Sequence, residues 1–131
     1  PVHPRTSQKI KDFKLEKYFK SNEILLTEPI GYIETIALIS TSKLVVTDSG
    51  GLQEESTYLK IPCLTLRENT ERPVTETEGT NTIIGTDTEL LLKEFKKIIS
   101  GKYKQGRLPK YWDGSTAKRI TQILKKKLLH S

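Results

Sequence analysis

The sequence predicts an α/β fold built on a doubly wound parallel sheet. Short apolar runs alternate with amphipathic helical segments along the chain, and no hairpin signal joins one run to the next. Polar segments leave the runs at residues 1–5, 27–30, 48–51 and 67–73. Ligands of such sheets bind beyond the carboxyl ends of the strands, so these segments are expected to share one binding edge.

The first part of the chain predicts helices around one short strand. An irregular helical pattern over residues 5–20 indicates two short helices that meet near residue 13. Residues 24–27 are expected to form a strand that ends before Pro29, because proline cannot donate a ladder hydrogen bond. From Ile30 to about Ser42, apolar residues repeat at helical spacing and predict an amphipathic helix.

The middle of the chain predicts a strand over residues 43–48, a helix over 50–60 and a strand over 63–67. Pro62 separates that helix from the second strand. Residues 68–82 are polar, and a short helix within them is expected to have Pro73 in its first turn. A polar segment of this length inside a compact domain is usually functional.

The last third predicts one short strand and two helices. The strand is expected at residues 82–85, after which Thr86 or Asp87 caps a helix that ends at Gly101. A turn at residues 111–114 leads into the final helix. The core face of the first helix is expected to hold Leu91, Phe95, Ile98 and Ile99, and that of the second Ala117, Ile120, Ile123, Leu124 and Leu128.

Composition limits the class of protein. The 131 residues are expected to form a single domain, and no apolar run approaches the roughly 20 residues of a membrane span. The net charge of +6 suggests nucleic acid, but much of the excess lies in residues 125–127 and no aromatic residues interleave with the basic ones. Cys63 is the single cysteine, which fits a buried thiol in a reducing, cytoplasmic setting. The chain contains no methionine, so we expect a piece of a longer protein.

The turn at Ser49, Gly50 and Gly51 is the strongest candidate for a site. It joins the apolar run 44–47 to a helical segment, and glycine lets a ligand approach the main chain or lets the backbone adopt a positive φ. A helix that begins there directs its first N–H groups and the positive end of its dipole toward the turn, which suits a phosphate. Two readings remain open from the residues alone: a phosphate site, or an ordinary structural turn whose helix carries Glu54 and Glu55 in its first turn for the dipole.

Five segments together resemble a known family, the non-hydrolysing UDP-N-acetylglucosamine 2-epimerases. They cover nearly the whole chain at consistent spacing. The segments are Thr-Asp-Ser-Gly-Gly-Leu-Gln-Glu-Glu at 47–55, Pro-Val-His-Pro at 1–4, Pro-Ile-Gly-Tyr at 29–32, Arg-Glu-Asn-Thr-Glu-Arg-Pro at 67–73, and Gly-Thr-Asn at 79–81 with Gly-Thr at 85–86.

The resemblance implies the C-terminal, Rossmann-like half of a two-domain fold like that of the B-type glycosyltransferases. It implies interconversion of UDP-N-acetylglucosamine and UDP-N-acetylmannosamine by elimination and re-addition of UDP, for cell-envelope polysaccharides, with no cofactor and no metal. The N-terminal domain, which is absent from this chain, is expected to carry the proton-transfer residues. The chain alone is therefore expected to be inactive, and the full-length protein is expected to be a cytoplasmic homodimer.

The resemblance also assigns roles to residues of this chain. Ser49, Gly50 and Gly51 would bind the diphosphate, Arg72 would reach the diphosphate or the sugar, and Glu55 would accept hydrogen bonds from the ribose. Further residues would lie at the cleft, Pro29 and Ile30 beside the uracil and His3 near a second, activating nucleotide sugar.

Alternative roles and functions stay open at this point. Glu55 could serve the helix dipole, Arg72 could form a surface ion pair with Glu71 or Glu76, and Pro29 with Ile30 could form a plain turn. At the level of the protein, a hydrolysing 2-epimerase or a nucleotide-sugar glycosyltransferase fits the same architecture. A basic domain that binds nucleic acid or another polyanion is the alternative of a different class.

Overall fold

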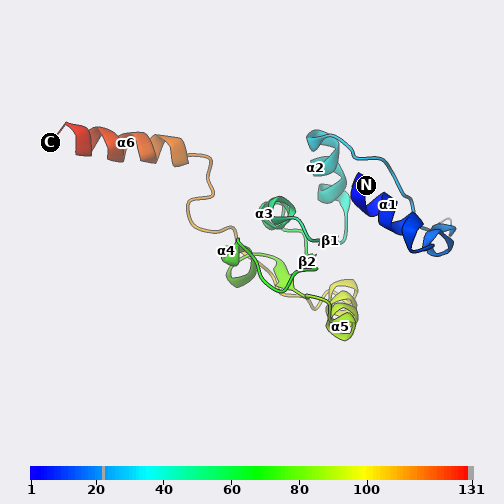
Figure 1. The fold of residues 1–131 in the computed structure, drawn as a ribbon. Helices are drawn as coiled ribbons and strands as arrows, with labels where there is room; N and C mark the ends of the chain where they lie inside the picture. Colours follow the sequence, from blue (N-terminus) through cyan, green and yellow to red (C-terminus); the bar gives the residue numbers. More distant parts are fainter. Residues whose placement is uncertain (22, 130–131) are drawn as a thin grey trace. The chain divides into compact units, whose positions relative to one another are not determined.

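The structure, a computed structural model, describes residues 1–21 and 23–129. The chain divides into two units, Pro1–Leu38 and Ile39–Ser131 (Figure 1). The first unit contains helix α1 (Pro4–Asp12), the 3-10 helix η1 (Glu16–Phe19) and the start of α2 (Tyr32–Thr41). The second contains the sheet and the four remaining helices.

The predicted pair of short helices in the first unit is confirmed. Pro4 is the first residue of α1, where its missing N–H costs no hydrogen bond. The helix ends at Asp12, and Lys14 follows with a φ of 52°, a left-handed conformation that stops the helix before η1 begins. The break therefore falls where the sequence predicts it.

The predicted strand at residues 24–27 is wrong. These residues have no strand conformation, and Leu25 is 84% exposed. Among the described residues 1–21 and 23–38, one backbone hydrogen bond ties the segment to a distant part of the unit, from the N–H of Val2 to the carbonyl of Thr27 at 2.9 Å. A strand needs a ladder of such bonds along a neighbour, and one bond does not make a ladder.

The sheet has three parallel strands in the order β1 (Val45–Thr47), β2 (Cys63–Thr65) and β3 (Asn81–Ile83). Val45 pairs with Cys63, which pairs with Asn81. The parallel α/β fold is confirmed, although each strand is shorter than the sequence predicts. Because the strands are parallel, their carboxyl ends lie at one end of the sheet and their amino ends at the other.

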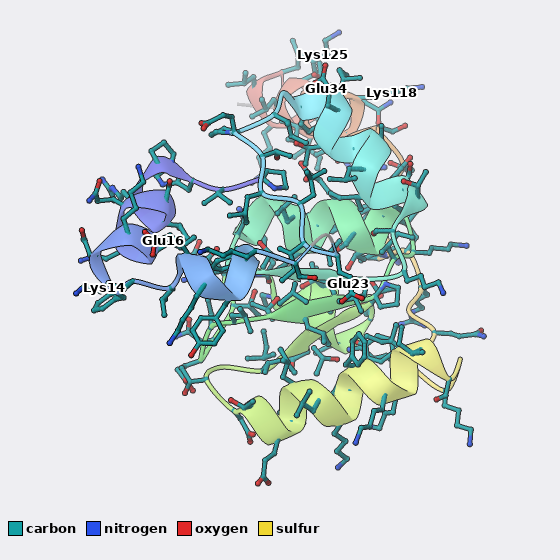
Figure 2. All side chains as sticks on the ribbon, turned by 90° about the vertical axis from the view of Figure 1, so that its right-hand side faces the viewer. Lys14, Glu16, Glu23, Glu34, Lys118 and Lys125 are labelled. Atoms are coloured by element: carbon teal, nitrogen blue, oxygen red, sulfur yellow. The ribbon has the colours of Figure 1, made fainter. Side chains whose placement is uncertain are left out.

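Helices flank the sheet. Helix α3 (Gly50–Tyr58) and the short α4 (Pro73–Thr77) contact the strands, while α5 (Thr88–Ile99) lies on the other side of the sheet from α3 (Figures 1 and 2). The carboxylate of Asp87 accepts a hydrogen bond from the N–H of Leu90 at 2.9 Å, so Asp87 is the N-cap of α5. The final helix is α6 (Thr116–Leu128).

The core around the sheet is unusually polar. Besides Pro109, four apolar residues in the described ranges have buried side chains, namely Ile39, Cys63, Leu64 and Ile84. Hydroxyl and amide side chains fill the space between the sheet and helices α3 and α4, and all of them are buried: Gln53, Ser56, Thr57, Thr65, Thr75 and Asn81. The predicted burial of Cys63 is confirmed, and this burial raises the pKa of its thiol.

The predicted core faces of the last two helices are only partly correct. In α5 the buried side chain is Glu94, which pairs with Lys97 at 2.6 Å, whereas Phe95 is 43% and Ile99 53% exposed. The apolar stripe of α6 is exposed as well. Helical periodicity shows which residues share a face but carries no information about what covers that face.

The segment after α5 packs against the amino ends of β2 and β3. The hydroxyl of Tyr103 lies 2.5 Å from the hydroxyl of Thr82 and donates to the carbonyl of Thr80 at 3.0 Å. The ammonium of Lys104 donates to the carbonyls of Glu76 and Asn81. Burial is the main cause that raises the pKa of Tyr103 to about 12 and lowers that of Lys104.

Gly106 packs directly against the backbone next to β3. A Cβ atom there would lie 2.4 Å from the carbonyl carbon of Gly79 and 2.7 Å from the amide nitrogen of Thr80. Both contacts are with backbone atoms, which cannot rotate away. Glycine is therefore required at position 106, because the segment that contains it lies so close to the backbone of Gly79 and Thr80.

Candidate functional site

The turn after β1 presents unused hydrogen-bonding groups. Ser49 is the N-cap of α3, with extended backbone angles, yet its hydroxyl makes no capping hydrogen bond to the helix. A hydrogen bond from the N–H of Ser49 to the hydroxyl of Thr47, at 3.0 Å, stabilises the conformation of the turn. The first N–H groups of a helix have no partner within the helix. This turn can therefore offer a serine hydroxyl and several N–H groups to one acceptor.

Two glycines keep the approach to these groups free of side chains. A Cβ atom on Gly50 would have no heavy atom within 4 Å, and one on Gly51 would have only the Ser49 hydroxyl oxygen, at 3.9 Å. Neither residue has a positive φ, so that part of the sequence argument is wrong. The use of glycine here is instead that an acceptor can reach the main chain closely.

Glu55 lies one and a half turns into α3, on the same helix that opens at Ser49. The side chain is half-buried, and its carboxylate makes no hydrogen bond or ion pair with any described residue. No acidic residue occupies the first turn of α3, so the expectation that Glu54 and Glu55 lie there is wrong. The helix dipole falls off within the first turn, which leaves Glu55 without that structural role.

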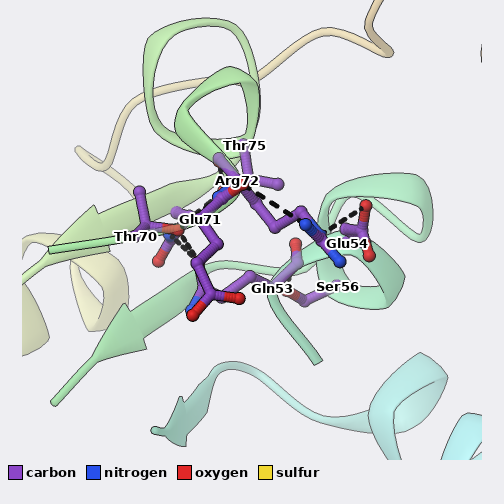
Figure 3. Close-up of polar contacts among 8 residues, drawn as sticks. Gln53, Glu54, Ser56, Thr70, Glu71, Arg72 and Thr75 are labelled. Atoms are coloured by element: carbon purple, nitrogen blue, oxygen red, sulfur yellow. Dashed lines mark hydrogen bonds and ion pairs between the residues drawn. The ribbon is translucent and has the colours of Figure 1, made fainter. Parts of the chain in front are cut away.

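Arg72 comes to the same helix from the loop after β2. Its Nε atom lies 3.1 Å from an Oε1 of Glu54, and its Nη1 donates to the carbonyl of Glu71 at 3.3 Å (Figure 3). The ion pair that the sequence suggests with Glu71 or Glu76 is not formed among the described residues; the Glu71 carboxylate pairs with Arg67 at 3.4 Å instead. The structure therefore places Arg72 against α3, the helix that is capped by Ser49 and carries Glu55.

A buried polar network lies behind these residues. The Gln53 side-chain oxygen accepts hydrogen bonds from the hydroxyl of Thr70 at 2.6 Å and from the Asn81 amide at 3.1 Å. Asn81 also donates to the hydroxyl of Thr75 at 3.1 Å and accepts from Thr65 at 2.6 Å. The network joins α3, the loop after β2, α4 and the strands. Sequence reasoning missed it, although Gln53 stands inside the motif at 47–55.

Comparison with known proteins decides the family. The sequence profile of the UDP-N-acetylglucosamine 2-epimerase family matches residues 1–125. The chain belongs to this family. It is 43% identical to a UDP-N-acetylglucosamine 2-epimerase of Methanocaldococcus jannaschii over 94% of the chain, and 40% identical to one of Methanococcus maripaludis over 95%. It spans about a third of the length of these relatives, 33% and 34% respectively.

A solved structure of the family agrees in fold. The crystal structure of the Methanocaldococcus jannaschii UDP-GlcNAc 2-epimerase in complex with UDP-GlcNAc and UDP superposes with a TM-score of 0.81 at 40% identity. The match covers 95% of this chain and 34% of that one. The epimerase resemblance predicted from the five sequence segments is thereby confirmed.

Three of the residues that the epimerase resemblance singles out lie in the first unit. His3 is exposed and is the N-cap of α1, where its Nδ1 atom accepts from the N–H of Arg5 at 3.2 Å. Pro29 is exposed and Ile30 half-buried, in the segment before α2. Their roles at a nucleotide stay predictions.

Two kinds of feature are not found among the described residues of this chain. No group of three or more His, Cys, Asp or Glu side chains in residues 1–21 and 23–129 is arranged to hold a metal ion. Within the same ranges, no helix combines the length and the apolar character that crossing a membrane requires.

Proposed function

We propose that this chain is the C-terminal, UDP-binding domain of an enzyme that interconverts UDP-N-acetylglucosamine and UDP-N-acetylmannosamine. One observation carries the proposal: Ser49, Gly50 and Gly51 form an open turn with an unused hydroxyl at the start of the helix that carries Glu55. A related epimerase of the same fold has been crystallised with UDP-GlcNAc and UDP, which supports a nucleotide at this turn.

The proposed roles follow from the chemistry of each group. The hydroxyl of Ser49 and the N–H groups of Gly50 and Gly51 would donate to the diphosphate, at the positive end of the α3 dipole. Glu55 would accept hydrogen bonds from both ribose hydroxyls, as a carboxylate does in dinucleotide sites. The guanidinium of Arg72 would add a positive charge beside the diphosphate.

The reaction requires these groups because UDP leaves and returns. A base removes the proton at C2 of the sugar, the bond from C1 to the UDP oxygen breaks, and that electron pair departs with UDP as a glycal forms. UDP then adds back to C1 while C2 is protonated on the opposite face. Donors oriented in advance stabilise the charge that develops on the departing diphosphate. The proton-transfer groups are proposed to belong to an N-terminal domain.

The remaining roles complete the proposal. Pro29 and Ile30 would contact the uracil, and His3 would lie near a second nucleotide sugar. The complete polypeptide would be a homodimer in the cytoplasm, with a product used for cell-envelope polysaccharides. No cofactor is required, because the hydrogen at C2 is lost and regained as a proton.

Calorimetric titration of the complete polypeptide with UDP tests the proposal. Ser49→Ala and Glu55→Ala are each expected to weaken UDP binding about tenfold or more, since a hydrogen bond to a charged group is worth about 1.5–3 kcal/mol. Glu89→Ala, on the exposed start of α5, is the control and should leave UDP affinity unchanged. ATP should not compete with UDP.

Product analysis separates the epimerase from the enzymes that share its architecture. Incubation with UDP-N-acetylglucosamine should give UDP-N-acetylmannosamine with no net release of UDP. Free N-acetylmannosamine would indicate a hydrolysing enzyme, and sugar transfer to an acceptor would indicate a glycosyltransferase. Failure of the wild-type polypeptide to bind UDP would contradict the proposed function altogether.

A further inference from the structure

We propose that Thr70, held by Gln53, is a positioning residue that fixes Arg72 against the nucleotide site. This inference rests on the proposed function, in which Arg72 lies beside the diphosphate of UDP. It concerns what holds Arg72 in that position. Helix α3 holds Arg72 at two points. Glu54 contacts its side chain, and Gln53 holds its backbone through Thr70 (Figure 3).

The hydroxyl of Thr70 is a link between the helix and the arginine. It donates to the side-chain oxygen of Gln53 at 2.6 Å and accepts from the backbone N–H of Arg72 at 2.9 Å. A hydroxyl has a single hydrogen, and an N–H can only donate, so the direction of both bonds is determined. The Thr70 side chain therefore connects α3 to the backbone of Arg72 itself.

The orientation of the Gln53 amide follows from its neighbours. The Thr75 hydroxyl donates to the carbonyl of Arg72 at 2.7 Å, so it must accept from the Asn81 side-chain nitrogen. Asn81 then directs its other N–H at Gln53, which must present its oxygen there. The same oxygen receives Thr70. Buried Thr75 and Gln53 thus hold the carbonyl and, through Thr70, the N–H of the same residue, Arg72.

Magnitudes indicate that the Thr70 link, which is anchored on the buried Gln53 side chain, places Arg72 more than the ion pair does. The Arg72 and Glu54 side chains are 45% and 39% exposed, and ion pairs at such exposure contribute about 0–1 kcal/mol. Gln53 is fully buried, with 0% exposed, and an unpaired group in such a network carries the full desolvation cost. A displacement of about 1 Å in a group that contacts the reacting molecule can cost about 100-fold in rate.

The test compares Thr70→Val with Thr70→Ser in the complete polypeptide, with UDP affinity and epimerase kinetics as readouts. Valine has nearly the shape of threonine but breaks the link, so we expect UDP binding to weaken about tenfold and kcat to fall further. Serine keeps the hydroxyl and should restore both to within about twofold. Thr80→Val is the matched control: it removes a buried hydroxyl that lies outside this network and donates to the carbonyl of Ile61 at 2.7 Å, and it should lower the unfolding temperature while UDP affinity stays unchanged.

A double-mutant cycle with Arg72→Gln shows whether Thr70 acts through Arg72. If it does, Thr70→Val causes little further loss of UDP affinity once Arg72 has been replaced. The proposal is overturned if Thr70→Val binds UDP like the wild type, if Thr80→Val has the same effect as Thr70→Val, or if the losses from Thr70→Val and Arg72→Gln add. The proposed function fails separately, through Ser49→Ala and Glu55→Ala variants that bind UDP normally.

Discussion

The two ends of the three-stranded sheet differ in how their polar groups are used. At the amino ends, Tyr103 and Lys104 bond to backbone carbonyls, and Gly106 lies against the backbone of Gly79. At the carboxyl end of β1, the hydroxyl of Ser49 makes no capping hydrogen bond to α3, and a Cβ atom on Gly50 would meet no atom within 4 Å. The same parallel strands thus end in a closed region on one side and an open one on the other.

This difference shows how one small fold separates stability from binding. Groups at the amino ends are satisfied within the protein and contribute to folding. Groups at the carboxyl ends are available to a ligand. The buried polar network around Gln53 and Asn81 stabilises the segments that carry them. Substitutions at the two ends are therefore expected to affect different measurements.

Gly106→Ala is expected to give the largest change, a loss of about 3 kcal/mol in the free energy of unfolding. The added Cβ would lie 2.4 Å from a backbone atom of Gly79, and overpacking of this kind costs about 1–3 kcal/mol or more. Denaturant unfolding of the complete polypeptide measures it. UDP affinity of the folded fraction should be unchanged, and a weakened UDP affinity would mean that the two ends of the sheet are not independent.

Gly50→Ala is expected to have the opposite profile. Alanine fits the helical backbone and meets no atom within 4 Å, so stability should stay the same or rise by about 0.5 kcal/mol. The methyl group would occupy the approach to the main chain, and UDP affinity should fall about tenfold, which corresponds to about 1.4 kcal/mol. Calorimetry and thermal unfolding of one preparation check both. Unchanged UDP affinity would remove the turn from the site.

Tyr103→Phe is expected to reduce stability by about 1 kcal/mol, the usual contribution of one hydrogen bond. The ring remains and only the hydroxyl that bonds to Thr80 and Thr82 is lost. UDP affinity and epimerase rate should not change. A loss of activity without a loss of stability would place Tyr103 in the chemistry and contradict the division between the two ends.

The contribution of the Tyr103 hydroxyl to stability is also expected to depend on pH. Burial raises the pKa of Tyr103 to about 12 from its ordinary value of 10.0, so the folded state favours the neutral phenol. The contribution of the Tyr103 hydroxyl to the free energy of unfolding is fully present below pH 10 and is lost as the pH rises toward about 12. The stability difference between wild type and Tyr103→Phe, from denaturant unfolding, should narrow across this window. A constant difference would show that the phenol is not buried as described.

Much of the fold could be predicted because each segment carries a local signal. Proline at the start of α1 and α4, Asp87 at the cap of α5 and the glycines after β1 all act within a few residues. The strand expected at residues 24–27 could not be judged in this way, because a strand depends on a neighbour that is distant in the sequence. The exposure of Phe95 and Ile99 could not be predicted for the same reason, because it depends on which distant segments pack against α5.

The site was predictable in part for a similar reason. Ser49, Gly50, Gly51 and Glu55 follow one another on one turn and one helix, so the motif alone groups them. Arg72 is 17 residues after Glu55 in the sequence, and its contact with Glu54 depends on the course of the loop after β2. The network of Gln53, Thr70 and Asn81 joins residues from three separate segments. Polar residues of this kind look like surface residues until their partners are known.

Three consecutive residues of α3 have three different tasks. Gln53 is buried in the network, Glu54 pairs with Arg72, and Glu55 is free of protein partners among the described residues. Successive residues of an α-helix are rotated by about 100° from one another. One residue inserted between Ser49 and Gln53 would turn all three side chains by that angle and move each to the wrong neighbour. We therefore expect this segment to vary through substitution and to reject insertions and deletions.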